Sequence, residues 1–97
     1  MPKGYWIANI EVHDTEAYEA YKLANAEPFA KYSGRFLVRA GHNTPKEGDI
    51  LPRVVVIEFP TYADALACYE SDLYQDAKAI RDPISEGRLV IAEGLEN

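Results

Sequence analysis

The order in which strand-forming and helix-forming segments follow one another constrains this sequence more than any other feature. Segments rich in β-branched and aromatic residues predict four strands, over residues 5–12, 35–40, 53–59 and 88–93. Helical patterns occupy the stretches between the first and second strands and between the third and fourth. With right-handed crossovers, this order predicts an α+β, ferredoxin-like βαββαβ fold, in which the helices cover one face of a four-stranded antiparallel sheet.

Capping residues define where the predicted helices begin. Asp14 is a good N-cap for a helix over residues 15–31. Pro28 lacks a backbone donor, so it predicts a kink or an early end in that helix. The second helical region is expected in two parts, between residue 61 and about residue 81.

Length and charge narrow the classes of function. Ninety-seven residues fit one domain, residues 1–97. The chain has 10 basic and 16 acidic residues and a formal net charge of −6, so it repels phosphate backbones and no nucleic-acid partner is expected. The longest apolar run is too short to cross a bilayer and nothing indicates a signal peptide, so no membrane partner is expected and the cytoplasm is the expected compartment.

Alternation along the strands divides the predicted sheet into two faces. The uncharged face is assigned to the helix side and comprises Trp6, Ala8, Ile10, Val12, Phe36, Val38, Ala40, Val55, Ile57, Phe59, Val90 and Ala92. The other face mixes apolar and polar residues: Tyr5, Ile7, Asn9, Glu11, Arg35, Leu37, Arg39, Val54, Val56, Glu58, Leu89, Ile91 and Glu93. A contiguous exposed apolar patch indicates an interface, so two copies are expected to pair through these faces as a homodimer.

Blocks covering almost the whole chain carry a resemblance to a known family. They are residues 4–12, 35–41, 55–60 and 67–71, then Tyr74 and Arg81, and finally residues 90–94. In this order they resemble the bacterial family described as domain of unknown function 1330, within the dimeric α/β-barrel superfamily. The resemblance implies a ferredoxin-like protomer that forms a barrel with its partner. It implies no residue roles, because the superfamily includes cofactor-free monooxygenases, haem enzymes, isomerases and binding proteins.

The first candidate site is a polar set on the face between the two sheets: Asn9, Arg39, Glu58 and Glu93. In a partly dry site, Glu58 can act as a general base and Arg39 can bind a substrate carboxylate. The alternative is that Arg39 pairs with Glu58 or Glu93 across the dimer, as buried interface charges usually do.

The second candidate site is a cleft between the helices and the sheet. Asn25 lies on the inward stripe of the first helix, between Tyr21 and Phe29. The expected lining is Trp6, Tyr18, Tyr21, Tyr62 and Tyr69, which suits a small aromatic or quinone-like ligand. The alternative is an ordinary core in which tyrosines fill space and reach the surface with their hydroxyls.

The remaining candidates are isolated residues. His42 starts the predicted loop over residues 41–52 and is a further catalytic candidate. Arg81 can bind a substrate anion, or it can complement the helix dipole. Cys68 has acidic neighbours, which favours a packing role over a nucleophilic one. The histidines lack metal-ligand spacing, so no metal site is expected.

These observations lead to one functional hypothesis with alternatives. The leading hypothesis is a homodimeric enzyme that needs no cofactor and acts on a small organic substrate, aromatic or carboxylate. The first alternative is a non-catalytic module that binds a small ligand or is associated with stress. The second is a purely structural dimer without a pocket.

Overall fold

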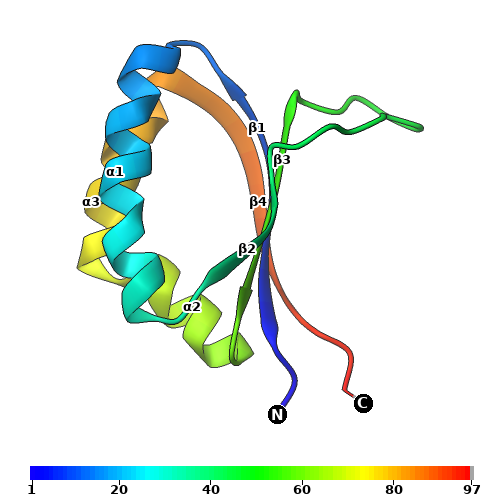
Figure 1. The fold of residues 1–97 in the computed structure, drawn as a ribbon, viewed down its shortest axis with the longest axis vertical. Coiled ribbons are helices and arrows are strands. Elements are labelled where there is room, and N and C mark those ends of the chain that lie inside the picture. Colours follow the sequence, from blue (N-terminus) through cyan, green and yellow to red (C-terminus); the bar gives the residue numbers. More distant parts are fainter. Residues whose placement is uncertain (97) are drawn as a thin grey trace.

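The computed structural model of the chain describes residues 1–96. Its secondary structure follows the predicted order, and the second helical region forms two α-helices and a short 3-10 turn, η1 (Figure 1). The elements are β1 (Gly4–Val12), α1 (Thr15–Lys31), β2 (Arg35–Arg39), β3 (Arg53–Phe59), α2 (Tyr62–Glu70), α3 (Asp72–Arg81), η1 (Asp82–Ile84) and β4 (Ser85–Glu93).

The four strands form one antiparallel sheet in the order β2-β3-β1-β4. All three α-helices lie on the same side of this sheet, which curves toward them (Figure 1). The α+β ferredoxin-like fold predicted from the sequence is therefore confirmed for the protomer.

The core lies between the sheet and α2, at the end of the sheet where β1 begins. Phe59, Ala65 and Cys68 are fully buried there. The indole Nε1 of Trp6 donates a hydrogen bond to the Ala65 carbonyl oxygen at 2.9 Å, which fixes α2 to the central strand. Phe29 meets the Trp6 ring edge-on, with 5.2 Å between the ring centroids. This aromatic packing attaches α1 to the same core.

Strand β4 differs from the prediction in its start and in its faces. It begins at Ser85 rather than at residue 88. Its register with β1 turns Leu89 and Ile91 toward the helices, and both pack against the core, whereas Val90 is 57% exposed on the outer face. The predicted faces of β4 are wrong. The prediction placed the charged Glu93, and with it Leu89 and Ile91, on the face away from the helices. Glu93 pairs with the first residue of β1, at the edge of the sheet, where its carboxylate is exposed to water.

A β-bulge in β2 overturns the predicted position of Arg39. The pairing of β2 with β3 shifts between Phe36 and Val38, so that Leu37 is an extra residue in this strand. Beyond the bulge, Arg39 pairs with Val55, which faces the helices. Arg39 therefore belongs to the helix side of the sheet, and the expectation that it lies between two sheets is wrong. Val38 moves to the outer face by the same shift.

Helix α1 continues past Pro28 to Lys31, so the predicted early end is wrong. Pro28 and Phe29 are both buried, and their packing supports the last turn despite the missing backbone donor. The chain leaves the helix at Ser33, which has a positive φ of 60°, and the Gly34 amide donates to the Phe29 carbonyl at 2.8 Å. None of the helices of residues 1–96 has the length and apolar character needed to cross a membrane.

The helices pack on the sheet unequally. Helix α2 packs against β1, β3 and β4, whereas α1 and α3 pack mainly against each other. Figure 1 shows α1 and α3 side by side, opposite the concave face of the sheet. This arrangement leaves a cavity between the α1–α3 pair and the sheet.

Candidate functional site

The cavity has a volume of about 280 Å³ and is lined by the inner faces of α1, α3 and the sheet. One end is aromatic. Trp6 and Tyr74 meet there with 4.7 Å between ring centroids, and Tyr69 and Phe29 lie against the same rings. Aromatic side chains of this kind are suited to contact a planar apolar group.

The other end of the cavity is strongly basic. Six of the ten lysine and arginine residues of the chain line this cavity, but only one of its sixteen acidic residues does. The basic residues are Lys22, Arg39, Arg53, Lys78, Arg81 and Arg88, and the acidic one is Asp82. Arg88 pairs with Asn9 on the outer face, and its guanidinium donates to the Asp49 carbonyl oxygen at 3.1 Å, so its charge lies at the rim of the cavity. The other five basic side chains lie on the helices or on the helix side of the sheet.

Sheet register explains this polarity. Residues facing the helices form rows across the strands, and the row through Trp6 contains only apolar side chains. The next row has Arg39 at its end, and the row after that pairs Ile10 with Arg53. Moving along β1 from Trp6 to Ile10 therefore leads from the aromatic end of the cavity to its basic end.

The basic residues on the helices have acidic partners. Lys78 Nζ lies 2.6 Å from Asp82 Oδ2, and Arg81 lies 3.8 Å from Asp82 Oδ1. Lys22 lies 3.2 Å from the exposed Glu19. One carboxylate is therefore shared by Lys78 and Arg81, which leaves their side of the cavity with excess positive charge.

Two basic residues on the helix side of the sheet, Arg39 and Arg53, stack on aromatic rings instead. The Arg53 guanidinium lies 5.0 Å from the centroid of the Tyr18 ring, and that of Arg39 lies 4.2 Å from the Phe36 ring. Neither has a carboxylate partner among residues 1–96, and the buried Nε of Arg53 has no hydrogen-bond partner there. These two guanidinium groups are the strongest candidates for binding an anion.

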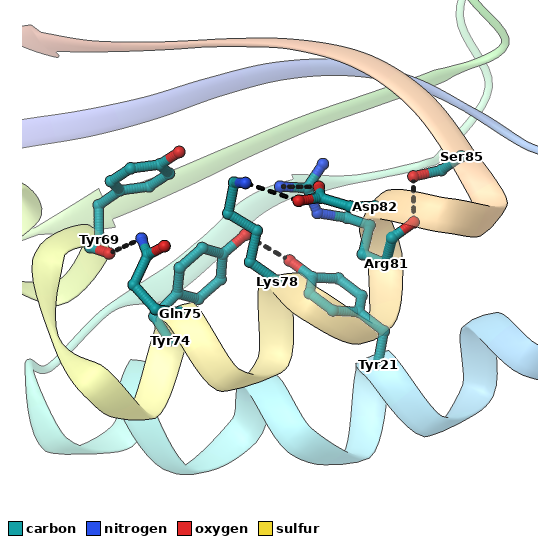
Figure 2. A network of polar contacts seen from close by, with 8 residues as sticks. All are labelled: Tyr21, Tyr69, Tyr74, Gln75, Lys78, Arg81, Asp82 and Ser85. Carbon is teal, nitrogen blue, oxygen red and sulfur yellow. Dashed lines mark hydrogen bonds and ion pairs between the residues drawn. The ribbon is translucent and has the colours of Figure 1, made fainter.

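A pair of tyrosine hydroxyls lies between the two ends (Figure 2). Tyr21 of α1 and Tyr74 of α3 share a hydrogen bond of 2.8 Å between their hydroxyl oxygens. Burial raises the pKa of Tyr21, although the Tyr74 hydroxyl and the charge of Arg81 oppose the shift. Burial is the main cause that raises the pKa of Tyr74, and the nearby Tyr21 raises it further. Both hydroxyls therefore stay protonated at neutral pH and can donate hydrogen bonds.

Arg81 stands beside this pair, with its guanidinium 5.6 Å from the Tyr21 ring centroid. Burial favours the neutral form of Arg81, but the charges of Tyr74 and Tyr21 when ionised and of Asp82 outweigh it and raise the pKa of Arg81. The Ser85 hydroxyl donates to the Arg81 carbonyl oxygen at 2.8 Å and secures the end of α3 (Figure 2). The Arg81 Nε is buried and has no hydrogen-bond partner among the described residues.

The structure brings together most of the residues predicted for the helix–sheet cleft. Trp6, Tyr21, Asn25 and Arg81 line the cavity, as do Tyr18 and Tyr69, and Arg39 joins them through the bulge. Tyr62 does not line the cavity and is exposed. Sequence reasoning missed Arg53, although it alternates with Val55 and Ile57 and so shares their face, and it missed Lys22, Lys78 and Arg88.

The other candidates lie outside the cavity. Glu58 is on the outer face, within 3.1 Å of Arg35 and 3.5 Å of Lys3, and accepts a hydrogen bond from the Tyr5 hydroxyl at 3.2 Å. Partial burial raises the pKa of Glu58, but the Tyr5 hydroxyl and the charges of Lys3 and Arg35 outweigh it and lower the pKa overall. A carboxylate held in this way is a weak base. Its arginine partner is Arg35, not Arg39.

Asn9 also lies on the outer face, where it holds the loop before β3. Its amide donates to the carbonyl oxygens of Leu51 and Arg53 at 2.8 and 2.9 Å, and its oxygen accepts from the Leu51 amide at 2.8 Å. These bonds use most of its hydrogen-bonding capacity. Asn9 is therefore a structural residue in the protomer.

His42 is exposed on the loop after β2 and does not line the cavity. Cys68 is fully buried, and burial raises its pKa to about 12, so its thiol is unreactive. Among residues 1–96, no three His, Cys, Asp or Glu side chains come together to hold a metal ion.

Comparison with known proteins assigns the chain to a family. The model of the family described as domain of unknown function, DUF1330, matches residues 3–95. The chain belongs to the DUF1330 family. None of the curated proteins compared matches this DUF1330 chain.

Solved structures share the fold of this DUF1330 protein at low sequence identity. A protein of unknown function from Rhodopseudomonas palustris is 16% identical, with a TM-score of 0.77 over 99% of this chain and 85% of its own. SnoaB, a cofactor-independent oxygenase from Streptomyces nogalater, is 13% identical, with a TM-score of 0.64 over 100% and 97%. A dimeric ferredoxin-like protein of unknown function from a Jannaschia species is 14% identical, with a TM-score of 0.67 over 94% and 98%.

Proposed function

We propose that the helix–sheet cavity of this DUF1330 protein binds a small, flat organic anion. The observation that carries the proposal is the enrichment of basic residues: leaving aside Arg88 at the rim, five of the ten basic residues line this cavity, against one of the sixteen acidic residues. Concentrated charge of one sign in a low-dielectric cavity attracts ligands of the opposite sign.

The polarity of the cavity orients such a ligand. An apolar ring fits against Trp6, Tyr69 and Tyr74, and the anionic group then reaches Arg39 and Arg53 at the basic end. Guanidinium groups bind carboxylates through paired hydrogen bonds, and aromatic rings stack on flat apolar groups. The ligand is therefore an aromatic or similarly planar acid.

The same donors support a catalytic role without a cofactor. Arg81, Tyr21 and Tyr74 are held in place before any ligand binds, so they can stabilise negative charge that develops on a substrate. The cofactor-independent oxygenase SnoaB shares the fold, which shows that this architecture accommodates such chemistry in that protein. We therefore propose, as a second function that depends on ligand binding, that the protein is an enzyme that uses these donors and needs no cofactor.

We also propose that the protein is a homodimer that pairs through the outer faces of its sheets. Across that face, Val90, Ile7, Val56 and Val38 form one continuous apolar row through all four strands. Ile7 and Val38 are 43% and 39% exposed. Burying this row against a second copy removes it from water. The solved ferredoxin-like protein from Jannaschia is described as dimeric.

Titration calorimetry with benzoate and its neutral relative benzamide tests the binding proposal. Benzoate is expected to bind and benzamide to bind at least tenfold more weakly. Arg53→Gln is expected to weaken benzoate binding by about 10- to 100-fold, because a hydrogen bond to a charged group contributes about 1.5–3 kcal/mol. Arg35→Gln, on the outer face, is the matched control and should leave affinity unchanged. Equal binding of the acid and the amide would contradict the proposal.

A further inference from the structure

Resting on the proposed ligand site, we infer that the ligand presents a single ionised oxygen, that of a phenol or an enol, to Tyr21, Tyr74 and Arg81. These residues lie where the aromatic end of the cavity meets its basic end. The two hydroxyl oxygens lie 2.8 Å apart, so together they can bind one ligand oxygen.

A count of hydrogen bonds supports the inference. The two tyrosine hydroxyls have two protons, and the bond between them uses one. Their mutual bond is the one hydrogen bond of these hydroxyls among residues 1–96, although the Asn25 side chain lies within reach of the Tyr21 hydroxyl. Tyr74 is 1% exposed and Tyr21 is 6% exposed, so bulk water does not freely supply an acceptor for the other proton. A buried hydroxyl proton that faces a cavity is satisfied by an acceptor oxygen on the ligand.

Arg81 provides the charge for the same oxygen. Its Nε is buried and unpartnered, and its nearest acid, Asp82, is also bound by Lys78 at 2.6 Å. Arg81 is the charged side chain that acts on both Tyr21 and Tyr74, and Asp82 is the one acidic residue that lines the cavity. This surplus of positive charge favours an oxygen that has lost its proton.

Geometry distinguishes this oxygen from a carboxylate. Tyr74 takes part both in the hydroxyl pair and in the aromatic cluster, where its ring lies 4.7 Å from the Trp6 ring. A ligand oxygen that accepts from the hydroxyl pair therefore lies beside the aromatic cluster. Phenols and enols place their oxygen directly on the planar system, whereas a carboxylate oxygen is one atom further out.

A phenol whose ionised form absorbs visible light gives a direct test. We expect 4-nitrophenol bound to the full chain to titrate at least about one pKa unit below the free compound, because neighbouring positive charge favours the ionised form. Absorbance of the bound phenolate across a pH series, with protein in excess, measures this value. A bound compound that titrates at or above the free value, or no binding of 4-nitrophenol, would overturn the inference.

Matched variants assign the effect to the named residues. Tyr21→Phe and Tyr74→Phe should each return the titration of bound 4-nitrophenol toward the free value, and Arg81→Met should do so more strongly. Tyr32→Phe, outside the cavity, should not change it. If a cavity variant fails to fold, the wild-type titration still decides the inference. Binding of benzoate alone would refute the phenolate inference and leave the proposed function standing, whereas failure of both compounds would refute both.

Discussion

The hydroxyl oxygens of Tyr21 and Tyr74 lie 2.8 Å apart, although 53 positions separate the two residues in the chain. Their hydrogen bond joins α1 to α3 on the side that faces the sheet (Figure 2). Because α1 and α3 pack mainly against each other, this bond contributes to the wall that keeps the cavity between the helices and the sheet. The pair is both a structural contact and the centre of the candidate site.

The first prediction concerns the stability of this pair. Tyr21→Phe and Tyr74→Phe should each lower the free energy of unfolding by about 1–2 kcal/mol, because each leaves a buried hydroxyl without its partner. The double variant should lose less than the sum of the two, since the second change removes no further bond. Urea denaturation of the four proteins measures this coupling. Tyr62→Phe, at an exposed position, is the control, and strict additivity would contradict the interpretation.

The second prediction concerns Asn9 and the loop before β3. Asn9→Ala removes three hydrogen bonds to residues 51 and 53, and should lower the free energy of unfolding by about 1–3 kcal/mol. The loop over residues 41–50 should also become more sensitive to limited proteolysis. Asn43→Ala, whose side chain is exposed on that loop, should have a smaller effect. If Asn9→Ala changes neither quantity, Asn9 is not the anchor of the loop.

The fold could be predicted because local patterns agree with the tertiary structure. Asp14, the predicted cap, accepts a hydrogen bond from the Ala17 amide and starts α1, and the Thr61 hydroxyl accepts one from the Asp64 amide at the start of α2. Alternation in β1 and β3 also assigned the buried face of these strands. The single added residue in β2, Leu37, has no such local pattern. Its consequence for Arg39 appears only when β2 pairs with β3, which is a tertiary event.

The third prediction concerns the pH dependence of stability. The folded-state pKa of Glu58 lies below its ordinary value of 4.5, so its interactions stabilise the protein above pH 4.5. This contribution is lost as pH falls through the folded pKa. Glu58→Gln should therefore be less stable than wild type at pH 7, and the difference should shrink below pH 4.5. Thermal melts across this range test the prediction, with Glu27→Gln, at an exposed position on α1, as the control.

The candidate site could be predicted only in part. The inward stripe of α1 correctly placed Tyr21 and Asn25, because a helical face follows from spacing alone. The gathering of Arg39, Arg53 and Arg81 depends on three elements, β2, β3 and α3, meeting around one cavity. Arg53 was within reach of sequence reasoning, since it alternates with Val55. The meeting of the three elements was not, because it depends on strand register and on the gap between the helices and the sheet.

The last prediction concerns the dimer. Val90→Glu places a charge in the apolar row of the outer face, where Val90 is 57% exposed in the protomer, so the protomer fold should be preserved. In a dimer that pairs through this face, each introduced charge is removed from water, which opposes association. Light scattering at micromolar concentration should give a dimer mass for wild type and a monomer mass for Val90→Glu. Leu23→Glu, at an 80% exposed position on α1, should remain dimeric. A monomeric wild type would show that the apolar row has another role.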